Sequence, residues 1–504
     1  MAIDEKNPQA KPKMTDPDEK LVEIALSRGI FFPSSEIFGD NISGLWDYGP
    51  LGVKIFNNLV RQWRRTLDKI KAVEISGSVI LPRAVLQASG HEANFFDVTI
   101  TCSKCGAVYR VDKLLEKKED KNFEGLPDEE YARLVKSYGI RCEKCGGELK
   151  TIKKFGLMFG LKVGASQDDR SAMNAYLRPE ACQSIFLSFR RLFKVSGGKL
   201  PLIIGQTGKA FRNEISPRNN LLRQREFYHS DIEIFFEDNT VFEPINDREI
   251  NILDRKNDHI KKLKISEAVK SKVIENNVAA YAISVVADFL DGLGFKQEDI
   301  RYRKLYEEKA FYSKESFDVE IRKGDAWVEV MACNHRGDYD LSSYEKSGAA
   351  VSRVNQSLPN IFEISMGTDR LFYLLLYTTL KADAERTWFS LPVALSPYRA
   401  AVFPLLSKEE LEKVSESMVK SSDYTDEIYY LDSGSIGKRY RKSDEIGVPF
   451  AFTVDYQTLE DKTVTVRDRE TMQQFRLPAD KMNDMIRDSA SVDIDRLRKR
   501  YEAH

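Results

Sequence analysis

The sequence has few histidines, tryptophans and cysteines, almost no net charge and no long apolar run. It contains five His, four Trp and six Cys, and its 77 Lys and Arg against 78 Asp and Glu give a formal charge of −1. The longest apolar candidate, Leu371–Tyr377, has seven residues, whereas a membrane-spanning helix needs roughly 18. A balanced charge also means that any polyanionic partner must meet a local basic patch. The sequence therefore predicts no membrane span and leaves a nucleic-acid partner open.

The remaining composition is that of a charge-rich globular protein. Charged residues make up 31% and apolar residues 42% of the 504 residues, which excludes collagen-like, mucin-like and disordered chains. At roughly 150 residues per domain, this length favours about three domains. The first twenty residues carry acidic and basic side chains with no apolar stretch, which is unlike a secretory signal. We expect a cytoplasmic protein with a frayed N-terminus.

Four of the six cysteines form two short pairs, Cys102-Ser-Lys-Cys105 and Cys142-Glu-Lys-Cys145, and each pair runs into glycine. Two such turns present four thiolates to one tetrahedral ion, and glycine permits a tight turn after each pair. The alternative is a loop with four unligated thiols. Because four cysteine ligands leave no open position for water or substrate, the spacing predicts a structural zinc ion. The other two, Cys182 and Cys333, are expected to be buried as small hydrophobic side chains.

Changes of pattern along the chain predict a core with two insertions and a C-terminal domain. Apolar residues recur every three or four positions from Pro50 to Ile70, which predicts a helix, and Ser78–Leu81 reads as a strand closed by Pro82. Alternating strands and helices after Pro397 predict an α/β domain. The expected segments are core 1–97, zinc ribbon 98–159, core 160–236, charged helical insertion 237–300, core 301–392 and C-terminal domain 396–504.

Polar side chains recur on one face of a predicted strand. Alternation along this strand places one set together: Arg225, Phe227, His229, Asp231, Glu233 and Phe235. The expected neighbours are strands Leu202–Gln206 and Ala210–Ile215 and a loop at Ser216–Asn220. Within them Arg212 and Glu214 also share a face. Such a surface can clamp phosphate, bind an ammonium group and stack a flat base; the alternative is an ordinary half-exposed sheet.

A strand, a glycine turn and a buried helix are predicted from Ile361 onward. Arg370 then lies in the first helical turn, where free amides and the helix dipole favour an anion. On the preceding strand, Glu363 and Ser365 share a face. Further strands are expected at Phe317–Ile321 and Ala326–Met331, the second of which carries Glu329.

These elements resemble motifs 1, 2 and 3 of class II aminoacyl-tRNA synthetases, in their usual order. The likeness is carried by the helix and strand ending at Pro82, by Phe211-Arg-Asn-Glu214 with Arg225-Glu-Phe227, and by Gly367-Thr-Asp-Arg370. Within this class the chain resembles glycyl-tRNA synthetases of the dimeric type found in archaea, eukaryotes and some bacteria. Four further runs carry that likeness: Ser89-Gly-His-Glu-Ala-Asn-Phe95, Leu177-Arg-Pro-Glu180, Gly208-Lys-Ala-Phe-Arg-Asn-Glu-Ile-Ser-Pro-Arg218 and Tyr339-Asp-Leu341.

The resemblance covers nearly the whole chain and implies an α+β fold. Its core is an antiparallel sheet flanked by helices, with the zinc ribbon and the helical insertion added, followed by a C-terminal α/β anticodon-binding domain. It implies that glycine and ATP give glycyl-adenylate and pyrophosphate, after which glycine moves to the terminal adenosine of tRNA(Gly). Two anions approach each other only where positive charge screens them, which requires arginine and the Mg²⁺ that accompanies ATP.

The resemblance also implies roles for individual residues. Arg212 and Arg370 are the implied catalytic residues, on the α- and γ-phosphates. Phe227 stacks on adenine, and Glu329 ligates Mg²⁺. The full set implied for ATP is Arg212, Asn213, Glu214, Leu222, Arg223, Arg225, Phe227, Glu329, Val330, Gly367 and Arg370. The set implied for glycine is Glu180, Asp231, Glu363, Ser365 and Gly367.

The chain departs from the family pattern at Asp231, where a glutamate is general. Either the shorter carboxylate reaches glycine through a water molecule, or Glu233 lies closer. Since glycine has no side chain, a small pocket must exclude larger amino acids by clash while carboxylates hold the ammonium group. No editing segment and no Ser-His-Asp constellation are expected. His91 and His229 are expected to be structural hydrogen-bonding residues.

The partners implied by the resemblance are tRNA(Gly), ATP, glycine and a second copy of the chain in a homodimer. In the C-terminal domain, Lys438-Arg-Tyr-Arg-Lys442 suits tRNA phosphates and an unstacked base; a solvated loop is the alternative. Two rival readings are a sister class II synthetase and a non-catalytic paralogue that binds nucleic acid. The paralogue would be free to lose its catalytic residues, yet all four of them are present: Arg212, Glu214, Glu329 and Arg370.

Overall fold

The computed structural model describes residues 17–39, 42–119, 123, 125–164, 172–215, 217, 219–254, 259–306, 313–489 and 492–503. Two compact units are present: one holds Met1–Phe32, Asp47–Arg61 and Leu374–His504, and the other holds Pro33–Trp46 and Gln62–Tyr373. The expected frayed N-terminus falls largely on residues 1–16, and part of the expected loop falls on residues 216 and 218, all outside the described residues. Among the described residues, no helix is long and apolar enough to cross a membrane.

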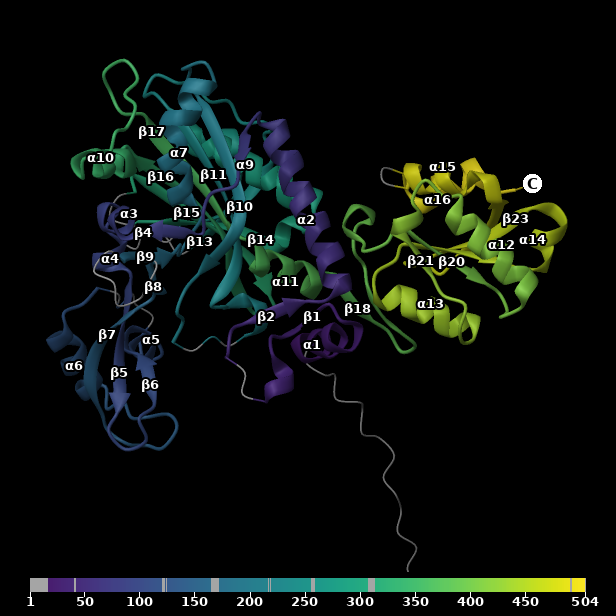
Figure 1. The fold of residues 1–504 in the computed structure, drawn as a ribbon, viewed down its shortest axis with the longest axis horizontal. Helices are drawn as coiled ribbons and strands as arrows, with labels where there is room; N and C mark the ends of the chain where they lie inside the picture. Colours follow the sequence, from purple (N-terminus) through teal and green to yellow (C-terminus); the bar gives the residue numbers. More distant parts are fainter. Residues whose placement is uncertain are drawn as a thin grey trace, which may run out of the picture. The chain divides into compact units, whose positions relative to one another are not determined.

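The larger unit is built on a broad sheet (Figure 1). Nine strands of the described residues join it in the order β13 (His259–Lys264), β12 (Glu249–Asp254), β14 (Ile300–Leu305), β15 (Glu315–Lys323), β16 (Ala326–Gly337), β17 (Asn360–Gly367), β11 (Glu226–Phe236), β10 (Leu202–Phe211) and β3 (Val73–Ile75). Neighbouring strands run antiparallel except in the pairs β10–β3 and β12–β14. The predicted fold class is therefore confirmed.

Strand β10 differs from its prediction. The pattern predicts two strands, Leu202–Gln206 and Ala210–Ile215, but one strand runs without a break because the residues between them also pair with β11. The strand ends at Phe211, and the next residue, Arg212, donates its backbone N–H to the Arg225 carbonyl at 2.9 Å. Arg212 and Glu214 consequently lie on the turn beyond the strand.

Helices cover both faces of this sheet. The predicted helix is present as α2 (Pro50–Lys69), and its apolar stripe is buried; Leu67 packs over Gly205 of β10. On the opposite face, α7 (Cys182–Val195) stacks Phe189 against Phe235 of β11, with ring centroids 4.3 Å apart. Helix α11 (Thr368–Thr379) follows β17 directly, as the strand, glycine and helix pattern predicts.

The cysteine-containing insertion has its own small core. Its elements are β5 (Phe96–Cys102), β6 (Val108–Arg110), α5 (Val111–Glu116), α6 (Asp128–Ser137) and β7 (Leu149–Gly156), and the strands pair in the order β6-β5-β7. Val111, Leu115 and Tyr131 are buried between them. Beside it in the chain lie β4 (Ile80–Pro82), α3 (Arg83–Ala88), α4 (His91–Asn94), β8 (Gly160–Val163) and β9 (Met173–Leu177).

The second insertion differs from the helical prediction in one part. Helices α8 (Ile265–Lys270) and α9 (Asn277–Gly292) are present, but β12 and β13 form a hairpin that extends the large sheet. In β12, Ile250 and Ile252 alternate with exposed or half-exposed positions and are buried. This period of two favours a strand, although the charged composition of the segment suggested a helix.

The smaller unit contains the predicted α/β domain. Its sheet has the order β21-β20-β22-β23-β24, with β20 (Ala400–Pro404), β21 (Ile428–Tyr430), β22 (Phe450–Val454), β23 (Thr463–Asp468) and β24 (Gln474–Pro478). Its helices are α1 (Pro17–Arg28), α12 (Glu409–Lys420), α13 (Ile436–Glu445), α14 (Tyr456–Asp461), α15 (Met482–Asp488) and α16 (Ile494–Tyr501). Outside the sheets and helices named so far lie α10 (Tyr339–Lys346), β1 (Phe31–Pro33), β2 (Trp46–Tyr48), β18 (Leu380–Ala382) and β19 (Thr387–Phe389).

The basic run of the smaller unit is helix α13, so the loop alternative is wrong. Within it Arg439 is 0% exposed and its guanidinium donates to the carbonyls of Pro404 and Asp432. Lys438 and Arg441 are exposed. Arg439 is therefore a structural residue, and only part of the run is available to a partner.

Candidate active site

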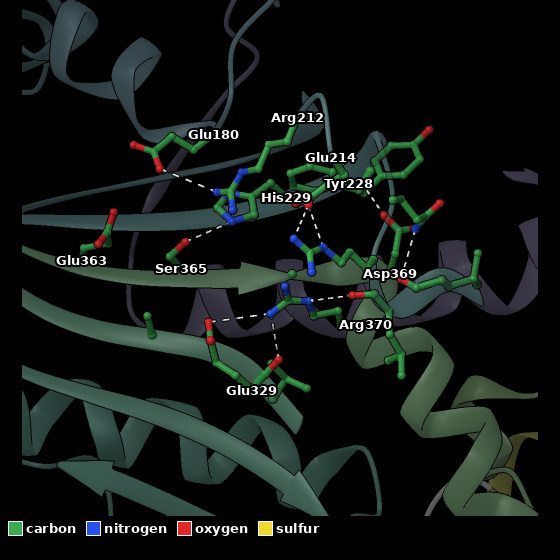
Figure 2. A pocket seen from close by; sticks show the side chains of 18 of the residues that line it. Glu180, Arg212, Glu214, Tyr228, His229, Glu329, Glu363, Ser365, Asp369 and Arg370 are labelled. Carbon is green, nitrogen blue, oxygen red and sulfur yellow. Dashed lines mark hydrogen bonds and ion pairs between the residues drawn. The ribbon is translucent and has the colours of Figure 1, made fainter. Parts of the chain in front are cut away.

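A cavity of about 280 Å³ opens on one face of the large sheet (Figure 2). Most of the residues expected to bind ATP or glycine line it: Glu180, Arg212, Glu214, Leu222, Arg223, Phe227, Glu329, Val330, Glu363, Ser365, Gly367 and Arg370. They come from the segment between β9 and α7, from the turn after β10, from strands β11, β16 and β17, and from the start of α11. The fold thus brings together side chains that lie far apart in the sequence.

One end of the cavity is rich in arginine. Arg212 donates to the Pro179 carbonyl at 3.0 Å, and its guanidinium lies 5.4 Å from the centre of the Phe227 ring. Arg223 donates to Glu214 at 2.6 Å. Two guanidinium groups and an aromatic ring thus line this end of the cavity, an arrangement that can hold a phosphate and a flat base.

Arg370 occupies the expected position in the first turn of α11. It donates to the backbone carbonyls of Leu222 and Glu329, both at 3.1 Å, and its guanidinium is 3.7 Å from the Glu329 carboxylate. Asp369, beside it, accepts from the Tyr228 backbone N–H. The helix start is therefore tied to β11 and β16, and an arginine stands where the helix dipole also attracts anions.

Two residues of the expected ATP set do not line the cavity. Asn213 donates its backbone N–H to Leu157 at 2.7 Å. Arg225 donates to the backbone carbonyl of Glu214 at 2.7 Å and also to that of Ser43. Both hold the turn that carries Arg212 and Glu214.

The other end of the cavity is acidic and more deeply buried. Strand register places its side chains in three rows across the sheet: Gly208, His229 and Gly367; then Gln206, Asp231, Ser365 and Ala332; then Ile204, Glu233, Glu363 and Asn334. The second and third rows contain three carboxylates on one face. Of these three, only Glu363 lines the cavity, together with Glu180, and two carboxylates suit a small cationic group.

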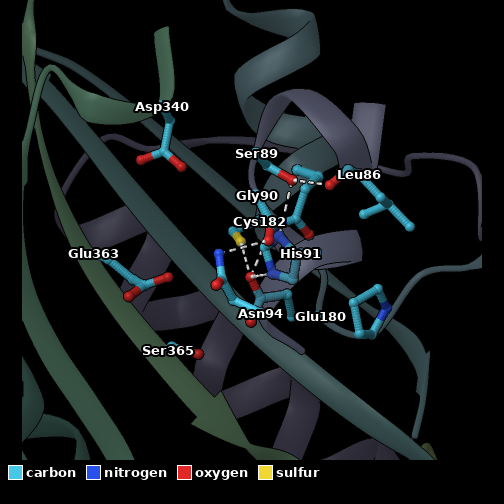
Figure 3. Close-up of polar contacts among 12 residues, drawn as sticks. Leu86, Ser89, Gly90, His91, Asn94, Glu180, Cys182, Asp340, Glu363 and Ser365 are labelled. Atoms are coloured by element: carbon cyan, nitrogen blue, oxygen red, sulfur yellow. Dashed lines mark hydrogen bonds and ion pairs between the residues drawn. The ribbon is translucent and has the colours of Figure 1, made fainter. Parts of the chain in front are cut away.

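Glu180 is held by one of its two oxygens (Figure 3). Its Oε1 lies 3.0 Å from His91 Nε2 and accepts from Gln183 at 2.7 Å and from the Cys182 thiol at 3.2 Å. Ser89 Oγ lies 2.8 Å from His91 Nδ1. Burial opposes ionisation, but His91, Arg336 and Arg212 together hold the pKa of Glu180 well below its usual range. Its Oε2 lies 3.9 Å from Arg212.

Sequence reasoning missed Arg336, which also lines this end of the cavity. It is 3% exposed and forms ion pairs with Asp340 at 2.7 Å and with Glu363 at 3.0 Å. Along the chain it comes directly after Cys333 to His335, and the Tyr339-Asp-Leu341 run begins three residues later. Its place beside that run was a weak signal, because burial in an ion pair leaves no periodic pattern in the sequence.

The expectations for Asp231 and Glu233 need correction. Both are 0% exposed and neither lines the cavity, so Glu233 does not lie closer in place of Asp231. His229 lines the cavity instead. Its Nδ1 is 3.1 Å from Asp231 and its Nε2 is 3.2 Å from Ser365 Oγ. The expectation that no Ser-His-Asp constellation exists is therefore wrong.

Glu233 is buried. The two cysteines outside the cluster are also buried, as expected. Cys182 and Cys333 are 1% and 0% exposed. Neither carboxylate oxygen of Glu233 has a hydrogen-bond partner among the described residues. Burial, with Glu363 nearby, raises the pKa of Glu233 well above its usual range, which favours the neutral acid.

The four cysteines of the insertion converge on one point. Their Sγ atoms all lie within 4.8 Å of one another, and two pairs are 3.6 Å apart, Cys102 with Cys145 and Cys105 with Cys142. Zinc–sulfur bonds of about 2.3 Å in a tetrahedron place sulfurs about 3.8 Å apart, so the set fits zinc. Gly106 and Gly146 have φ of 69° and 68°, which is the left-handed turn expected after each pair.

Two family models match the chain. A class II core domain of tRNA synthetases (G, H, P, S and T) matches residues 162–378, and an anticodon binding domain matches residues 400–489. Among solved structures, a prolyl-tRNA synthetase from Cryptosporidium parvum, complexed with halofuginone and AMPPNP, has a TM-score of 0.57 at 13% identity, covering 97% of this chain and 78% of that chain. The latter likeness shows the fold alone.

Curated relatives match along nearly their whole length. A glycine–tRNA ligase of Methanocaldococcus jannaschii is 32% identical, and the match covers 93% of this chain and 98% of that protein. A glycine–tRNA ligase of Thermococcus kodakarensis is 33% identical, and the match covers 94% and 98%. On this evidence, the chain belongs to the glycine–tRNA ligase family of class II aminoacyl-tRNA synthetases.

Proposed function

We propose that this protein activates glycine with ATP to give glycyl-adenylate and pyrophosphate, and then transfers glycine to the 3′ end of tRNA(Gly). The observation that carries the proposal is the single cavity with an arginine-rich end and an acidic end. ATP is a polyanion with a flat base, and glycine offers an ammonium group, so each substrate matches one end. The names of the curated relatives agree with this assignment.

Arg212 stands where the two ends meet, which suits the α-phosphate. Its guanidinium is 3.9 Å from the Glu180 carboxylate and 5.4 Å from the Phe227 ring. In this proposal Phe227 stacks on adenine and Glu180 holds glycine, so the phosphate between them meets Arg212. The positive charge lets the glycine carboxylate approach the α-phosphate and stabilises the charge that develops there. Arg370, at the start of α11, takes the γ-phosphate.

Mg²⁺ bound to ATP would be held by Glu329. Its carboxylate is 49% exposed and free to take a hard cation together with phosphate oxygens. When bound, the ion neutralises phosphate charge. Arg370, 3.7 Å from the same carboxylate, positions the γ-phosphate beside it.

At the acidic end, the glycine ammonium group is held by Glu180 and Ser365, with Gly367 leaving room beside them. Glu363 is paired with Arg336 at 3.0 Å and shapes the floor. Asp231 does not contact glycine directly and acts through His229, which lies between them. Larger amino acids are excluded because the side chains that enclose this end are fixed by buried ion pairs.

The tRNA is bound in part by the C-terminal α/β domain. This assignment rests on the anticodon-domain match over residues 400–489 and on the exposed side chains Lys438 and Arg441 of α13. They are three residues apart on the helix and so project from one side. They suit phosphate contacts, which contribute affinity without sequence specificity.

The cysteine cluster binds one structural zinc ion. Tyr109 donates a hydrogen bond to Cys142, and this holds the pKa of that thiol at about 6, which favours a thiolate ligand. We expect one equivalent of zinc per chain by atomic absorption, and its loss in Cys142→Ser. The matched variant Cys333→Ser, at a buried cysteine elsewhere, should retain the metal. Zinc retained in Cys142→Ser would contradict the assignment.

The proposal includes a homodimer and a cytoplasmic location, both implied by the resemblance to the family. Light scattering coupled to size-exclusion chromatography measures the first. A mass near that of one chain, 57.7 kDa, would contradict it. Cell fractionation measures the second.

The deciding experiment is ATP–pyrophosphate exchange with purified protein and single amino acids. We expect exchange that depends on glycine, followed by glycine transfer to tRNA(Gly). Exchange with serine but not glycine would assign the chain to a sister synthetase. No exchange with any amino acid would support the non-catalytic paralogue instead.

A further inference from the structure

His229 lies next to the Ser365 hydroxyl in the cavity (Figure 2), and a buried acid lies on its other side. Asp231 is 3.1 Å from its Nδ1, and Ser365 Oγ is 3.2 Å from its Nε2. Asp231 is 0% exposed, while His229 and Ser365 both line the cavity. A ligand in the cavity can therefore meet the charge of Asp231 only through His229 and Ser365.

The sheet leaves room for an imidazole at this position and at the same time fixes it. On the two neighbouring strands, the residues opposite His229 are Gly208 and Gly367, which have no side chains. A side chain at Gly208 would collide with the guanidinium of Arg178, which is 2% exposed. Burial lowers the pKa of Arg178, and Asp231 opposes that shift. The guanidinium of Arg178 therefore lies over Gly208, on one side of His229.

The hydrogen bonds that join Asp231, His229 and Ser365 all run in one direction. In the tautomer that suits a carboxylate, which only accepts, Nδ1 carries the proton and donates it to Asp231. Nε2 then has a lone pair and accepts from the Ser365 hydroxyl. With its proton directed at Nε2, Ser365 Oγ presents lone pairs to the cavity, and these accept from a positively charged N–H donor. Without Nε2 the hydroxyl could rotate and direct its own hydrogen at the ammonium group.

A nucleophilic serine would need the same three residue types but also an oxyanion site. Ser365 lies in the middle of β17, which pairs with β11 at Asp231 and with β16 at Ala332. The backbone N–H groups on both sides of the strand are engaged in these ladders, whereas an oxyanion site needs free donors near the serine. Asp231, His229 and Ser365 are therefore suited to orienting a ligand rather than to covalent catalysis.

We propose that His229 is a positioning residue of the amino-acid site: held by Asp231, it fixes the Ser365 hydroxyl as an acceptor for the ammonium group of glycine. This inference rests on the proposed function. It also explains how the shorter carboxylate at position 231 serves the site, because the histidine spans the distance between Asp231 and the cavity wall. The chemical class recognised is a primary ammonium group next to a carboxylate.

The test is the Michaelis constant for each substrate in ATP–pyrophosphate exchange, using the full chain. His229→Phe keeps a flat ring and removes both nitrogens. Asp231→Asn is nearly isosteric and reverses the direction of these hydrogen bonds. An amide that donates to Nδ1 leaves the proton on Nε2, which then donates to Ser365. For both variants we expect the KM for glycine to rise about tenfold or more, the loss expected for a hydrogen bond to a charged group, while the KM for ATP changes less than twofold.

The matched control is Ser230→Ala, on the same strand but the opposite face. Ser230 is 1% exposed and contacts Thr207 and Thr368 at 3.0 and 2.8 Å, so its loss also removes buried hydrogen bonds. We expect the KM for glycine to be unchanged there. A glycine KM that stays within twofold of the parent in both test variants would overturn the inference, and so would equal rises for glycine and ATP. If His229→Phe does not fold, Asp231→Asn decides by the same outcomes.

These outcomes separate the inference from the proposed function. If the parent protein shows no glycine-dependent exchange, the proposed function is wrong and the role of His229 in glycine binding is wrong with it. If the parent exchanges with glycine and the two variants match it, only the role of His229 is wrong.

Discussion

The two ends of the cavity differ in their charged side chains and are supported in different ways. At the arginine-rich end, the side chains of Arg212 and Arg370 are 29% and 37% exposed and donate mainly to backbone carbonyls. At the acidic end, Asp231 and Glu233 are 0% exposed, and Glu363 depends on Arg336. An exposed guanidinium keeps its hydration until a phosphate replaces it, whereas a buried carboxylate has lost its hydration on folding.

This difference implies different consequences of mutation at the two ends. Removing a charge at the arginine-rich end should affect catalysis and leave the fold intact. Removing a charge at the acidic end should affect stability first, because the opposite charge is left buried and uncompensated. The predictions below test that contrast, beginning with the largest expected effect.

The first prediction concerns the buried cation of the acidic end. Arg336→Met keeps apolar bulk but leaves Glu363 and Asp340 without their shared partner. We expect the free energy of unfolding to fall by about 3–5 kcal/mol, measured by urea denaturation. Arg353→Met is the control, since Arg353 pairs with Glu345 at the surface with 50% of its side chain exposed, and we expect a far smaller loss. Equal losses in the two variants would contradict the contrast.

The second prediction concerns the arginine-rich end. Arg212→Ala should slow glycine-dependent exchange by about 100- to 1,000-fold, the effect of removing one preorganised donor to a developing charge. The free energy of unfolding and the affinity for tRNA should stay close to those of the parent. Arg64→Ala is the control, because Arg64 is 56% exposed and, among the described residues, pairs with Glu74 at the surface. If Arg212→Ala exchanges as fast as the parent, the α-phosphate assignment fails.

The third prediction uses pH and concerns Glu233. A carboxyl group whose pKa is raised by folding keeps its proton in the native state after the unfolded chain has lost it. Its contribution to stability is complete below about pH 4.3 and falls as the pH rises toward the native pKa. In Glu233→Gln this loss is absent. The difference in unfolding free energy, variant minus parent, should therefore increase with pH, by up to about 1.4 kcal/mol per pH unit.

The measurement for Glu233 is a series of urea denaturations between pH 4 and pH 8. Glu298→Gln is the control, because Glu298 is exposed, and its difference from the parent should not vary with pH. A flat difference for Glu233→Gln would show that this carboxyl ionises like an exposed one and would remove the basis for treating it as neutral.

Local patterns predicted the position of Arg370 at the arginine-rich end. The turn from β17 into α11 is marked by Gly367 and by the apolar run after Arg370, so the position of Arg370 at the helix start follows from neighbours in the sequence. The resemblance to the family then identified Arg212 and Glu329. The two-strand prediction around Thr207 failed because pairing with β11 overrides the weak local propensity of that stretch.

The acidic end could not be predicted to the same depth, because it depends on pairing between distant strands. His229 and Ser365 meet across 136 residues of sequence, and alternation within each strand does not say which of their neighbours faces the cavity. Arg336 was missed because a buried ion pair leaves no periodic signal. Asp231 was recognised by its position in the motif, yet only the register shows that His229 stands in front of it.

The last and smallest effect is expected at His91, which supports the acidic end from outside the sheet. His91→Phe keeps the ring that lies 5.6 Å from Phe95 but removes the hydrogen bond to Glu180. Since Gln183 and Cys182 still hold the same oxygen at 2.7 and 3.2 Å, we expect the KM for glycine to rise only roughly threefold, with the KM for ATP unchanged. His259→Phe, at an exposed histidine, should change neither constant. A tenfold rise at His91 would mean that Glu180 relies on this one donor, and the two ends of the cavity would then differ less than their supporting contacts suggest.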